Sequence, residues 1–523
     1  MKEKAIKGKK TDPVPGGFLY VTAAVCGGAV LIVEILGAKM LSPYFGTSHF
    51  VWTAQIAVTL VSLAVGYWFG GRLADKKSGL HRLFLCILLA ALYLCVTVPL
   101  TRPVAEKGLE LRLALGSLLT SLFLFFVPLA LLAAVGPFLV RVMTQSIQVV
   151  GTQVGRLTAI STLGSVAGTI LIGYVLIPYF PNSLTMLGTA ASLLVLVVVY
   201  VLAWNRKGGR AFLAILSALF GLGLGWWGKG AEARLDLPGL VELERRNSNF
   251  GLMQVVEGGQ PPYRYYFNDF LCQNGMDPKT GQSVHLFTYM LHGLSRVYTP
   301  KIEKALFIGL GVGIVPMAMA EEGVQVDVVE INPAVVPLAR RHFGFQPERV
   351  RLFFDDGRHF LNECRNRYDT VLLDAFLGDS SPSHLMTREA FAAVRRVLNP
   401  GGTLVVNSFG NLSPGRDFLT ASLEKTLRSV FRSVVIHAED PEGNIFFVAA
   451  DRPELKFLHD PPDELTVHPS LRKSVRAALN GRFTADPARG RVLTDDFNPV
   501  DYYDAANREQ IRRELARNLL GGR

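Results

Sequence analysis

Long and short apolar runs occupy different halves of this chain of 523 residues. Over residues 17–230, apolar runs long enough to cross a bilayer follow one another with short polar connections. From residue 231 onward the apolar runs are short, and polar or amphipathic stretches separate them, as in a folded α/β domain. The pattern therefore predicts a helical membrane half followed by a water-soluble half.

The first half is predicted to be a transmembrane domain of six to seven helices. Its apolar segments are expected at residues 17–41, 50–71, 83–100, 113–140, 157–177, 183–204 and 211–227. The last segment is short, glycine-rich and ends in Trp226-Trp227, which suits a helix lying in the membrane interface as well as one crossing the bilayer. We therefore expect six spans and one marginal segment, with the lipid bilayer as a partner.

Basic residues predict the orientation of these spans. A Lys-rich tail occupies residues 1–16, and further basic stretches follow alternate spans, whereas the loops between them are less basic. An excess of Lys and Arg marks the cytoplasmic side, so the amino terminus is expected there. With six crossings the soluble half is cytoplasmic too, and the protein is a multi-pass protein of the cell membrane.

Three features of the spans bear on packing or function. Glu34 lies inside the first span, where a carboxylate is either functional or paired with a nearby cation such as Lys39. Gly164 and Gly168 have the small-xxx-small spacing that permits close helix contact. Residues 66–75, GYWFGGRLAD, resemble a cytoplasmic loop motif of major-facilitator transporters, which favours a transport or sensing role.

The second half is organised around residues 304–374. Its first apolar run predicts a buried parallel strand, and Gly309, Gly311 and Gly313 follow at alternate positions. Glycines let the backbone turn tightly and let a ligand approach the main chain. The next strand ends in Glu330, at the position where nucleotide-binding βαβ folds hold ribose hydroxyls.

Two further strand ends carry carboxylates. Asp356 and Gly357 follow the third strand, where an Asp can accept from an adenine amino group, and Asp374 ends the fourth strand. In open α/β sheets ligands bind at the carboxyl ends of the strands, so these acids are expected to face one crevice. Because Ile314 replaces the third glycine of a dinucleotide motif, the pattern is more typical of S-adenosylmethionine-binding domains.

The remainder of the soluble half divides around this core. Residues 231–300 predict a small antiparallel β unit with a lead-in helix, residues 301–455 a Rossmann-like domain, and residues 456–523 a charged, Pro-rich extension. The predicted fold is thus a multi-span α-helical membrane domain, then a small antiparallel β unit and an α/β Rossmann-like domain of the S-adenosylmethionine methyltransferase type.

Composition and charge narrow the choice of partners. Hydrophobic residues make up 50% of the chain and charged residues only 19%, in keeping with a membrane half. The net charge is +11, but the basic residues are scattered and many flank apolar segments, so nucleic acid is not expected as a partner. The five cysteines include no CxxC pair, so we expect neither a disulfide framework nor a metal site.

The stretch 240–450 resembles the spermidine synthases, or polyamine aminopropyltransferases. A small β unit, the glycine motif, the acids at the strand ends and the loop DAFLGDSSPSHL at 374–385 carry this resemblance, and the full layout is similar to the membrane-fused members. The resemblance implies a transferase that uses decarboxylated S-adenosylmethionine and an amine such as putrescine, without a metal. It also implies a homodimer or homotetramer, unless the spans impose another arrangement.

The resemblance assigns roles to particular residues. Six residues of the glycine turn and strand ends would hold the nucleoside: Gly309, Gly311, Gly313, Glu330, Asp356 and Gly357. Three residues would contact the acceptor: Gln273, Asp379 and Asp440. Asp374 would orient the amine and take its proton. Asp379 suits a loop-capping role equally well.

The amine-binding pattern of the family is altered here. Val312 stands where soluble synthases carry an Asp that meets the amine of the donor, and Phe287-Thr288-Tyr289 replaces a Tyr-(His or Gln)-Glu run. Intact S-adenosylmethionine is therefore also open as the donor, and methyl or aminocarboxypropyl transfer to a membrane-delivered acceptor is an alternative. A further alternative is a transporter or sensor whose soluble half binds nucleotide or polyamine without chemistry.

Overall fold

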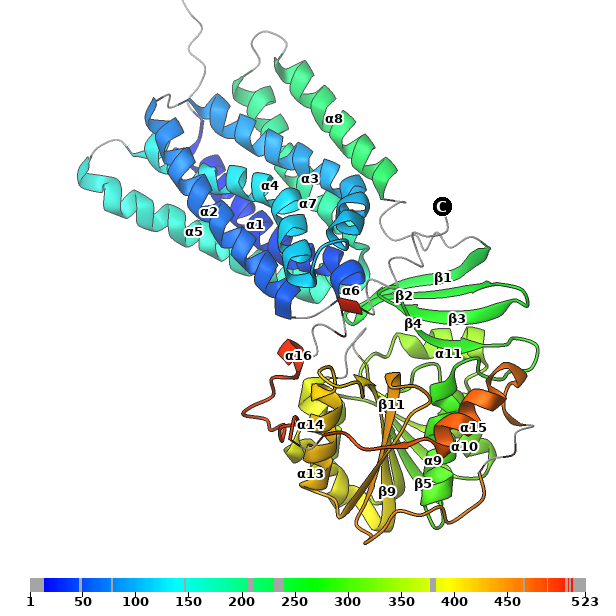
Figure 1. Ribbon diagram of the computed structural model, residues 1–523. Helices are drawn as coiled ribbons and strands as arrows, with labels where there is room; N and C mark the ends of the chain where they lie inside the picture. The colour runs from blue at the N-terminus through cyan, green and yellow to red at the C-terminus, as the bar shows by residue number, and fades with distance from the viewer. Residues whose placement is uncertain are drawn as a thin grey trace, which may run out of the picture. The chain divides into compact units, whose positions relative to one another are not determined.

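The chain forms two compact units, Met1–Arg234 and Leu235–Arg523. The computed structural model shows a helical first unit and a mixed α/β second unit (Figure 1). It describes residues 14–46, 49–76, 79–144, 147–205, 210–229, 239–376, 382–461, 463, 466–486, 488–503, 507 and 509–510.

The first unit is a bundle of long apolar helices. These are α1 (Gly16–Phe45), α2 (His49–Lys76), α3 (Leu80–Gly108), α4 (Leu113–Met143), α5 (Val150–Leu171), α7 (Asn182–Trp204) and α8 (Arg210–Gly228). A 3₁₀ turn, η1 (Ile147–Val149), precedes α5, which continues through a π-helical turn, η2 (Ile172–Leu176), into α6 (Ile177–Tyr179).

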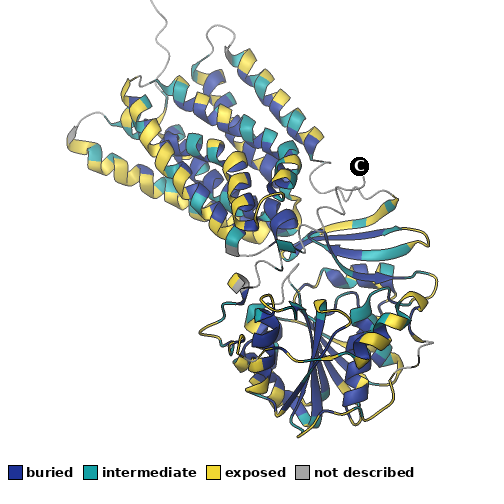
Figure 2. Cartoon of the chain, viewed as in Figure 1, coloured by how far each residue is buried: buried dark blue, intermediate teal, exposed yellow. Residues whose placement is uncertain are grey.

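Seven helices of the described residues are long and apolar enough to cross a membrane. They include the segment Ala211–Gly228, which with 18 residues is the shortest of the seven. Figure 2 shows many exposed residues along α5, and α5 includes the exposed apolar side chains Leu163 and Ile170. Because an odd number of crossings would put the two ends of the unit on opposite sides, the cytoplasmic placement of the second unit stays a prediction.

Small residues bring helices of the first unit close together. A Cβ added to Gly164 would lie 2.1 Å from the carbonyl oxygen of Ala24, and one added to Gly168 would lie 2.7 Å from that of Gly28. The close helix contact that the small-xxx-small spacing predicted is thereby confirmed, and it joins α5 to α1.

The transporter-like stretch 66–75 lies on α2. A Cβ added to Gly66 would lie 2.3 Å from the carbonyl oxygen of Ala130, and one added to Gly70 would lie 2.6 Å from Cα of Ala134. These glycines therefore pack α2 against α4. This packing accounts for the two glycines without a transport role.

The second unit begins with a four-stranded antiparallel sheet. Its strands, in spatial order, are β1 (Leu240–Ser248), β2 (Gly251–Gly258), β3 (Tyr263–Asn268) and β4 (Leu271–Met276). The helix α9 (Leu286–Tyr298) then leads into the larger sheet. The small antiparallel unit expected from the sequence is confirmed.

The larger sheet has eight strands in the order β12-β10-β11-β9-β8-β5-β6-β7. They are β5 (Lys304–Ile308), β6 (Gln325–Glu330), β7 (Arg351–Phe354), β8 (Tyr368–Leu373), β9 (Leu398–Asn411), β10 (Ser433–His437), β11 (Glu442–Ala450) and β12 (Arg482–Phe483). Strands β5 to β9 are mutually parallel where they pair, whereas β10, β11 and β12 run antiparallel to their neighbours. The predicted Rossmann-like fold of the methyltransferase type is confirmed.

Helices cover both faces of this sheet. One buried core joins it to α9, α10 (Ile314–Glu321), α11 (Val335–Phe343) and α15 (Arg472–Asn480). The other joins it to α12 (Gly357–Glu363), α13 (Arg388–Val397), α14 (Phe418–Arg428) and the short α16 (Val500–Tyr503). The stretch 456–523 was predicted as a charged, Pro-rich extension, and its described part adds β12 and α15 to this domain.

The order of the parallel strands reverses beside β5. The chain passes from β5 outward to β6 and β7, and then returns to β8 on the other side of β5. At such a switch point the connections leave in opposite directions and open a crevice beyond the carboxyl ends of the strands.

Candidate active site

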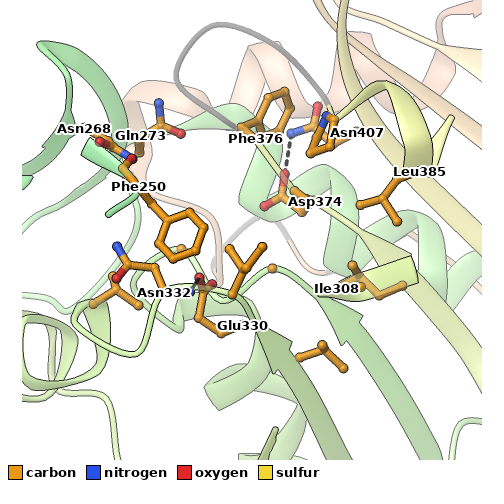
Figure 3. A pocket seen from close by; sticks show the side chains of 18 of the residues that line it. Phe250, Asn268, Gln273, Ile308, Glu330, Asn332, Asp374, Phe376, Leu385 and Asn407 are labelled. Carbon is orange, nitrogen blue, oxygen red and sulfur yellow. Dashed lines mark hydrogen bonds between the residues drawn. The ribbon is translucent and has the colours of Figure 1, made fainter. Parts of the chain in front are cut away.

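A cavity of about 250 Å³ lies at this switch point. Its lining comes from the glycine turn after β5, the ends of β6 and β8, the loop after β7, and parts of the small sheet, β9 and β11. Figure 3 shows Glu330 and Asn332 on one side of the cavity, with Asp374, Phe376 and Asn407 together on another. The predicted convergence of strand-end acids on one crevice is therefore seen in the structure.

The glycine turn adopts backbone angles that favour glycine. Gly309, Gly311 and Gly313 have φ values of +101°, +56° and +84°. A Cβ at Gly309 would lie 2.3 Å from the main-chain oxygen of Asp374, so the turn touches the end of β8 directly. Gly309 and Gly311 line the cavity, whereas Gly313 packs against the ring of Phe345 outside the lining.

Glu330 is held by main-chain hydrogen bonds at the end of β6. Leu310 N donates to Oε2 at 2.9 Å, and Asn332 N donates to Oε1 at 2.7 Å. Burial raises the pKa of Glu330, while these hydrogen bonds act to lower it. The carboxylate thus has a fixed orientation, and its remaining lone pairs can accept from vicinal hydroxyls.

Asp356 lies in the cavity lining, as predicted, and also caps α12. Its Oδ1 accepts from Arg358 N at 2.8 Å and from His359 N at 3.1 Å, and His384 Nε2 lies 3.0 Å from Oδ2. Burial acts to raise the pKa of Asp356, but the His359 N–H and His384 outweigh it and hold the pKa below its usual value. Gly357 follows as the first residue of α12 and also lines the cavity.

Asp374 sits at the end of β8 in a chain of polar side chains. Asn407 Nδ2 donates to Asp374 Oδ1 at 2.8 Å (Figure 3), and Asn444 Nδ2 donates to Asn407 Oδ1 at 2.9 Å. All three residues line the cavity. Burial raises the pKa of Asp374 to about 6, although the hydrogen bond from Asn407 acts to lower it.

Sequence reasoning missed Asn407, Asn444 and His384. Asn407 is only 1% exposed and interrupts the apolar strand β9. An Asn within an apolar strand was the one signal in the sequence that could have indicated a functional residue here. Its contact with Asn444 depends on the pairing of β9 with β11. His384 is 28 residues from Asp356 in sequence, so no local pattern linked them.

Of the three predicted acceptor residues, the structure brings Gln273 to the cavity. Gln273, on β4, lines the cavity. Asp440 is exposed in the turn between β10 and β11 and is not among the described residues of the lining. Asp379 lies outside the described residues. Val312 is 1% exposed and belongs to the hydrophobic core, so its side chain contributes to packing.

A thiol and an imidazole also face the cavity. Cys272 Sγ lies 3.6 Å from His285 Nε2, and both residues line it. Burial raises the pKa of Cys272 to about 12 and lowers the pKa of His285 to about 4. Both groups are therefore neutral at physiological pH, and the thiol is not an activated nucleophile.

Across the described residues, no group of three or more His, Cys, Asp or Glu side chains is arranged to hold a metal ion.

Comparison with known proteins identifies the family. The family model described as the spermine/spermidine synthase domain matches residues 285–439. The polyamine aminopropyltransferase of Vibrio vulnificus is 42% identical over 217 residues, which make up 39% of this chain and 71% of that protein. This chain belongs to the polyamine aminopropyltransferase family. It is therefore a transferase, and its relatives support aminopropyltransferase activity with a co-substrate of the S-adenosylmethionine type.

Other similar proteins match over different shares of their length. An N-terminal histidine N-methyltransferase of Emericella nidulans is 26% identical over 279 residues, which make up 48% of this chain and 49% of the relative. A probable spermidine synthase from Corynebacterium glutamicum shows 18% identity and a TM-score of 0.38, over 47% of this chain and 91% of that one. The match to the aminopropyltransferase family model lies within the second unit.

Proposed function

We propose that this protein is a membrane-bound aminopropyltransferase. It transfers the aminopropyl group of decarboxylated S-adenosylmethionine to an amine, and Asp374 takes the proton of that amine. The observation that carries the proposal is the hydrogen-bonded chain from Asn444 through Asn407 to Asp374, at the mouth of a glycine turn that can seat a nucleoside. Such a chain fixes one oxygen of the carboxylate and leaves the other toward the cavity.

The nucleoside of the donor would lie across the carboxyl edge of the sheet. Glu330 would accept hydrogen bonds from the ribose hydroxyls, since its orientation is already fixed by two main-chain donors. The missing Cβ at Gly309 lets the turn lie against the end of β8, and because Gly309 and Gly311 line the cavity, the nucleoside would lie beside this turn. Asp356 and the start of α12 would meet the adenine end.

The reaction requires an uncharged amine next to an electrophilic carbon. An ammonium group must lose its proton before its lone pair can attack the carbon bonded to the sulfonium. A carboxylate with a raised pKa accepts that proton more readily than an ordinary exposed one. The C–S bond then breaks, its electron pair stays on sulfur, and neutral methylthioadenosine leaves. Because the sulfonium is already a good leaving group, holding the two substrates in line supplies much of the rate.

Product identity tests the proposal directly. The purified full-length protein is incubated with putrescine or another amine and with decarboxylated S-adenosylmethionine. We expect release of methylthioadenosine, and Asp374→Asn should slow this release by about 10²–10⁴-fold while binding of methylthioadenosine persists. Failure to release methylthioadenosine with any amine would overturn the proposal.

A second candidate is an S-adenosylmethionine-dependent methyl- or aminocarboxypropyltransferase. The buried Val312 offers no charge at the glycine turn, and the amides of Asn268, Gln273 and Asn274 line the cavity. Amides can bind a carboxylate as readily as an amine, so they do not select against intact S-adenosylmethionine. One similar protein also carries the name of an N-methyltransferase. Release of S-adenosylhomocysteine would favour methyl transfer, whereas methylthioadenosine from the intact donor would favour aminocarboxypropyl transfer.

A transporter or sensor without chemistry is the remaining candidate, and turnover of either donor would exclude a purely binding role.

We propose that the aminopropyltransferase is a multi-pass protein of the cell membrane and that its second unit is cytoplasmic. We further propose a homodimer or homotetramer, as the family resemblance implies. Light scattering of the detergent-solubilised protein would report the number of subunits, and a monomer would contradict this assignment.

A further inference from the structure

The helical first unit contains a large cavity of its own. It has a volume of about 660 Å³ and lies among α1, α2, α4 and α5, which pack alongside one another (Figure 1). Ligand sites in proteins typically measure about 300–1,000 Å³. We call this space the membrane cavity, because its described lining comes from four helices that are long and apolar enough to cross a bilayer.

One end of the membrane cavity carries an ion pair. Asp75 is the last residue but one of α2, Arg141 stands two residues before the end of α4, and both line the cavity. Arg141 Nε lies 3.7 Å from Asp75 Oδ1, and both side chains are more than half exposed. This distance is too long for a direct hydrogen bond. The pair can therefore take up a ligand that carries one group of each charge.

The transporter-like stretch 66–75 forms one wall of the membrane cavity. Tyr67, Gly71, Ala74 and Asp75 all line it, and their spacing places them on one face of α2. A Cβ added to Gly71 would meet no heavy atom within 4 Å, so this glycine keeps the cavity wide. The stretch thus has one face that packs on α4 and another that faces a space for a ligand.

Hydroxyl groups of α5 line the same cavity. Thr158, Ser161, Thr162 and Ser165 lie on one face of that helix and belong to the described lining. Ser165 Oγ also donates to the carbonyl oxygen of Gly27 at 3.0 Å, which fixes α5 against α1. Hydroxyls can donate hydrogen bonds to phosphate and ester oxygens.

Away from its charged end the membrane cavity is largely apolar and about as deep as one leaflet. Leu63 on α2 and Leu132 on α4 belong to the lining far from the ion pair. At a rise of about 1.5 Å per residue, Leu63 is about 18 Å from Asp75 along α2, and Leu132 is about 14 Å from Arg141 along α4. One leaflet of the hydrocarbon core is about 15 Å thick. A charged end at the helix termini and an apolar part of this depth match the dimensions of one lipid molecule.

We propose that the membrane cavity binds an aminophospholipid, a lipid whose head group carries a primary ammonium and a phosphate, as in phosphatidylethanolamine. The ammonium pairs with Asp75, the phosphate accepts from Arg141 and from hydroxyls of α5, and an acyl chain occupies the apolar part. A phosphatidylcholine head has no N–H to donate, and a phosphatidylglycerol head has no cation for Asp75. This site belongs to the first unit and does not depend on the function proposed for the second.

Lipids with the same acyl chains and different head groups test this assignment. Native mass spectrometry of the delipidated full-length protein in detergent measures the binding of phosphatidylethanolamine, phosphatidylcholine and phosphatidylglycerol, with dodecylamine as a probe that lacks the phosphate. We expect phosphatidylethanolamine to have the lowest Kd, by about tenfold, because its ammonium alone forms charge-assisted hydrogen bonds to Asp75 beside a bound phosphate. Equal Kd values for the three lipids, or tighter binding of dodecylamine, would overturn the proposal.

A variant of the carboxylate tests the role of Asp75. Asp75→Asn keeps the shape but removes the charge, so phosphatidylethanolamine should bind no more tightly than phosphatidylcholine. Glu106→Gln is the matched control: it removes a carboxylate that lies 2.8 Å from Arg102 on α3, and Glu106 is not among the described residues of the lining. The control should keep the lipid preference of the unaltered protein. A preference that survives in Asp75→Asn would contradict the proposal.

A bulky side chain inside the membrane cavity tests its location. Gly71→Leu fills open space there, and Gly188→Leu on α7 is the control, because a Cβ at Gly188 also meets nothing within 4 Å and this residue is not in the described lining. Leu is a better helix former than Gly, so both variants should fold. We expect Gly71→Leu to raise the Kd of phosphatidylethanolamine by about tenfold or more, and the control to leave it unchanged.

Thermal unfolding and gel filtration report whether these variants are folded. If Gly71→Leu is not, Gly136→Leu on α4 replaces it, since Gly136 also lines the cavity and meets open space. The same affinity in the folded cavity variant and in Gly188→Leu would place the lipid elsewhere and overturn the proposal.

Discussion

Asp374 illustrates how a side chain can favour catalysis while opposing stability. Burial raises its pKa to about 6, so the folded protein binds this proton more tightly than the unfolded chain does. Its contribution to stability is therefore complete below the unfolded value of about 3.9 and is lost as pH rises through about 6. Activity depends on pH in the opposite sense, because the proposed proton acceptor must be ionised.

We expect turnover to decrease as pH falls through about 6, while this residue makes the folded state more stable. Asp374→Asn keeps the shape and the hydrogen bond from Asn407 but cannot accept the proton. Turnover should fall by about 10²–10⁴-fold, the usual contribution of a general base. The free energy of unfolding at pH 8 should be unchanged or higher. pH–rate profiles and thermal unfolding at pH 5 and pH 8 check both, and retained turnover would exclude Asp374 as the proton acceptor.

Asn407 is expected to be a positioning residue, because it acts on the proton acceptor Asp374 through one hydrogen bond. Its amide lowers the pKa of Asp374 against the larger effect of burial. In Asn407→Leu that hydrogen bond is lost, so the acidic midpoint of the pH–rate profile should move to higher pH, and kcat should fall by about tenfold. Asn444→Leu is the matched control one hydrogen bond further away, and it should shift the midpoint less. Equal midpoints in all three proteins would mean that the chain of amides serves only packing.

At the scale of elements, local motifs determined what could be predicted. The glycine turn and the ends of β6, β7 and β8 each follow a short apolar run, and parallel strands bring their carboxyl ends to one edge. The nucleoside side of the site was therefore placed from sequence. The Asp374–Asn407–Asn444 chain was not, because it requires the register between β9 and β11. Asp440 was proposed from a position in a hairpin, and the turn places it on the surface.

The glycine turn gives a prediction for an element as a whole. Gly309→Ala would bring a Cβ to 2.3 Å from the main-chain oxygen of Asp374, so the turn must move away from β8. Gly323→Ala, in the turn before β6, also has positive φ but meets open space. We expect both to lose about 1–2 kcal/mol of stability from backbone strain. Gly309→Ala alone should weaken methylthioadenosine binding, by about tenfold or more.

Isothermal titration calorimetry measures the affinity of Gly309→Ala and Gly323→Ala for methylthioadenosine. Thermal unfolding of the same samples reports the shared strain, so the two effects can be separated. Equal affinities in the two variants would show that the approach of Gly309 to β8 is not needed for the nucleoside site.

For the whole molecule, the sequence predicted two units of different character and placed the second unit in the cytoplasm, and that placement stays a prediction. Apolar length identified each helix of the first unit, since every backbone group in a bilayer must be paired within a helix. Whether the segment Ala211–Gly228 crosses stays a prediction, because an apolar helix of 18 residues suits a short crossing and an interfacial position alike. The side on which the second unit meets its substrates depends on that one segment.

A reporter fused after Arg523 decides between these arrangements. We expect it to be active on the cytoplasmic side, with the segment lying in the interface. Leu219 is 64% exposed on α8, and Leu219→Arg adds about 2.5–3.5 kcal/mol to the insertion of a crossing helix. An interfacial helix should tolerate Arg, so the reporter should stay where it is, as with the control Leu219→Ala. A reporter that is active outside in the unaltered protein, and that moves to the cytoplasm with Leu219→Arg, would show that the segment crosses. The nucleoside site would then face away from cytoplasmic donors, and the proposed reaction would need a donor supplied outside the cell.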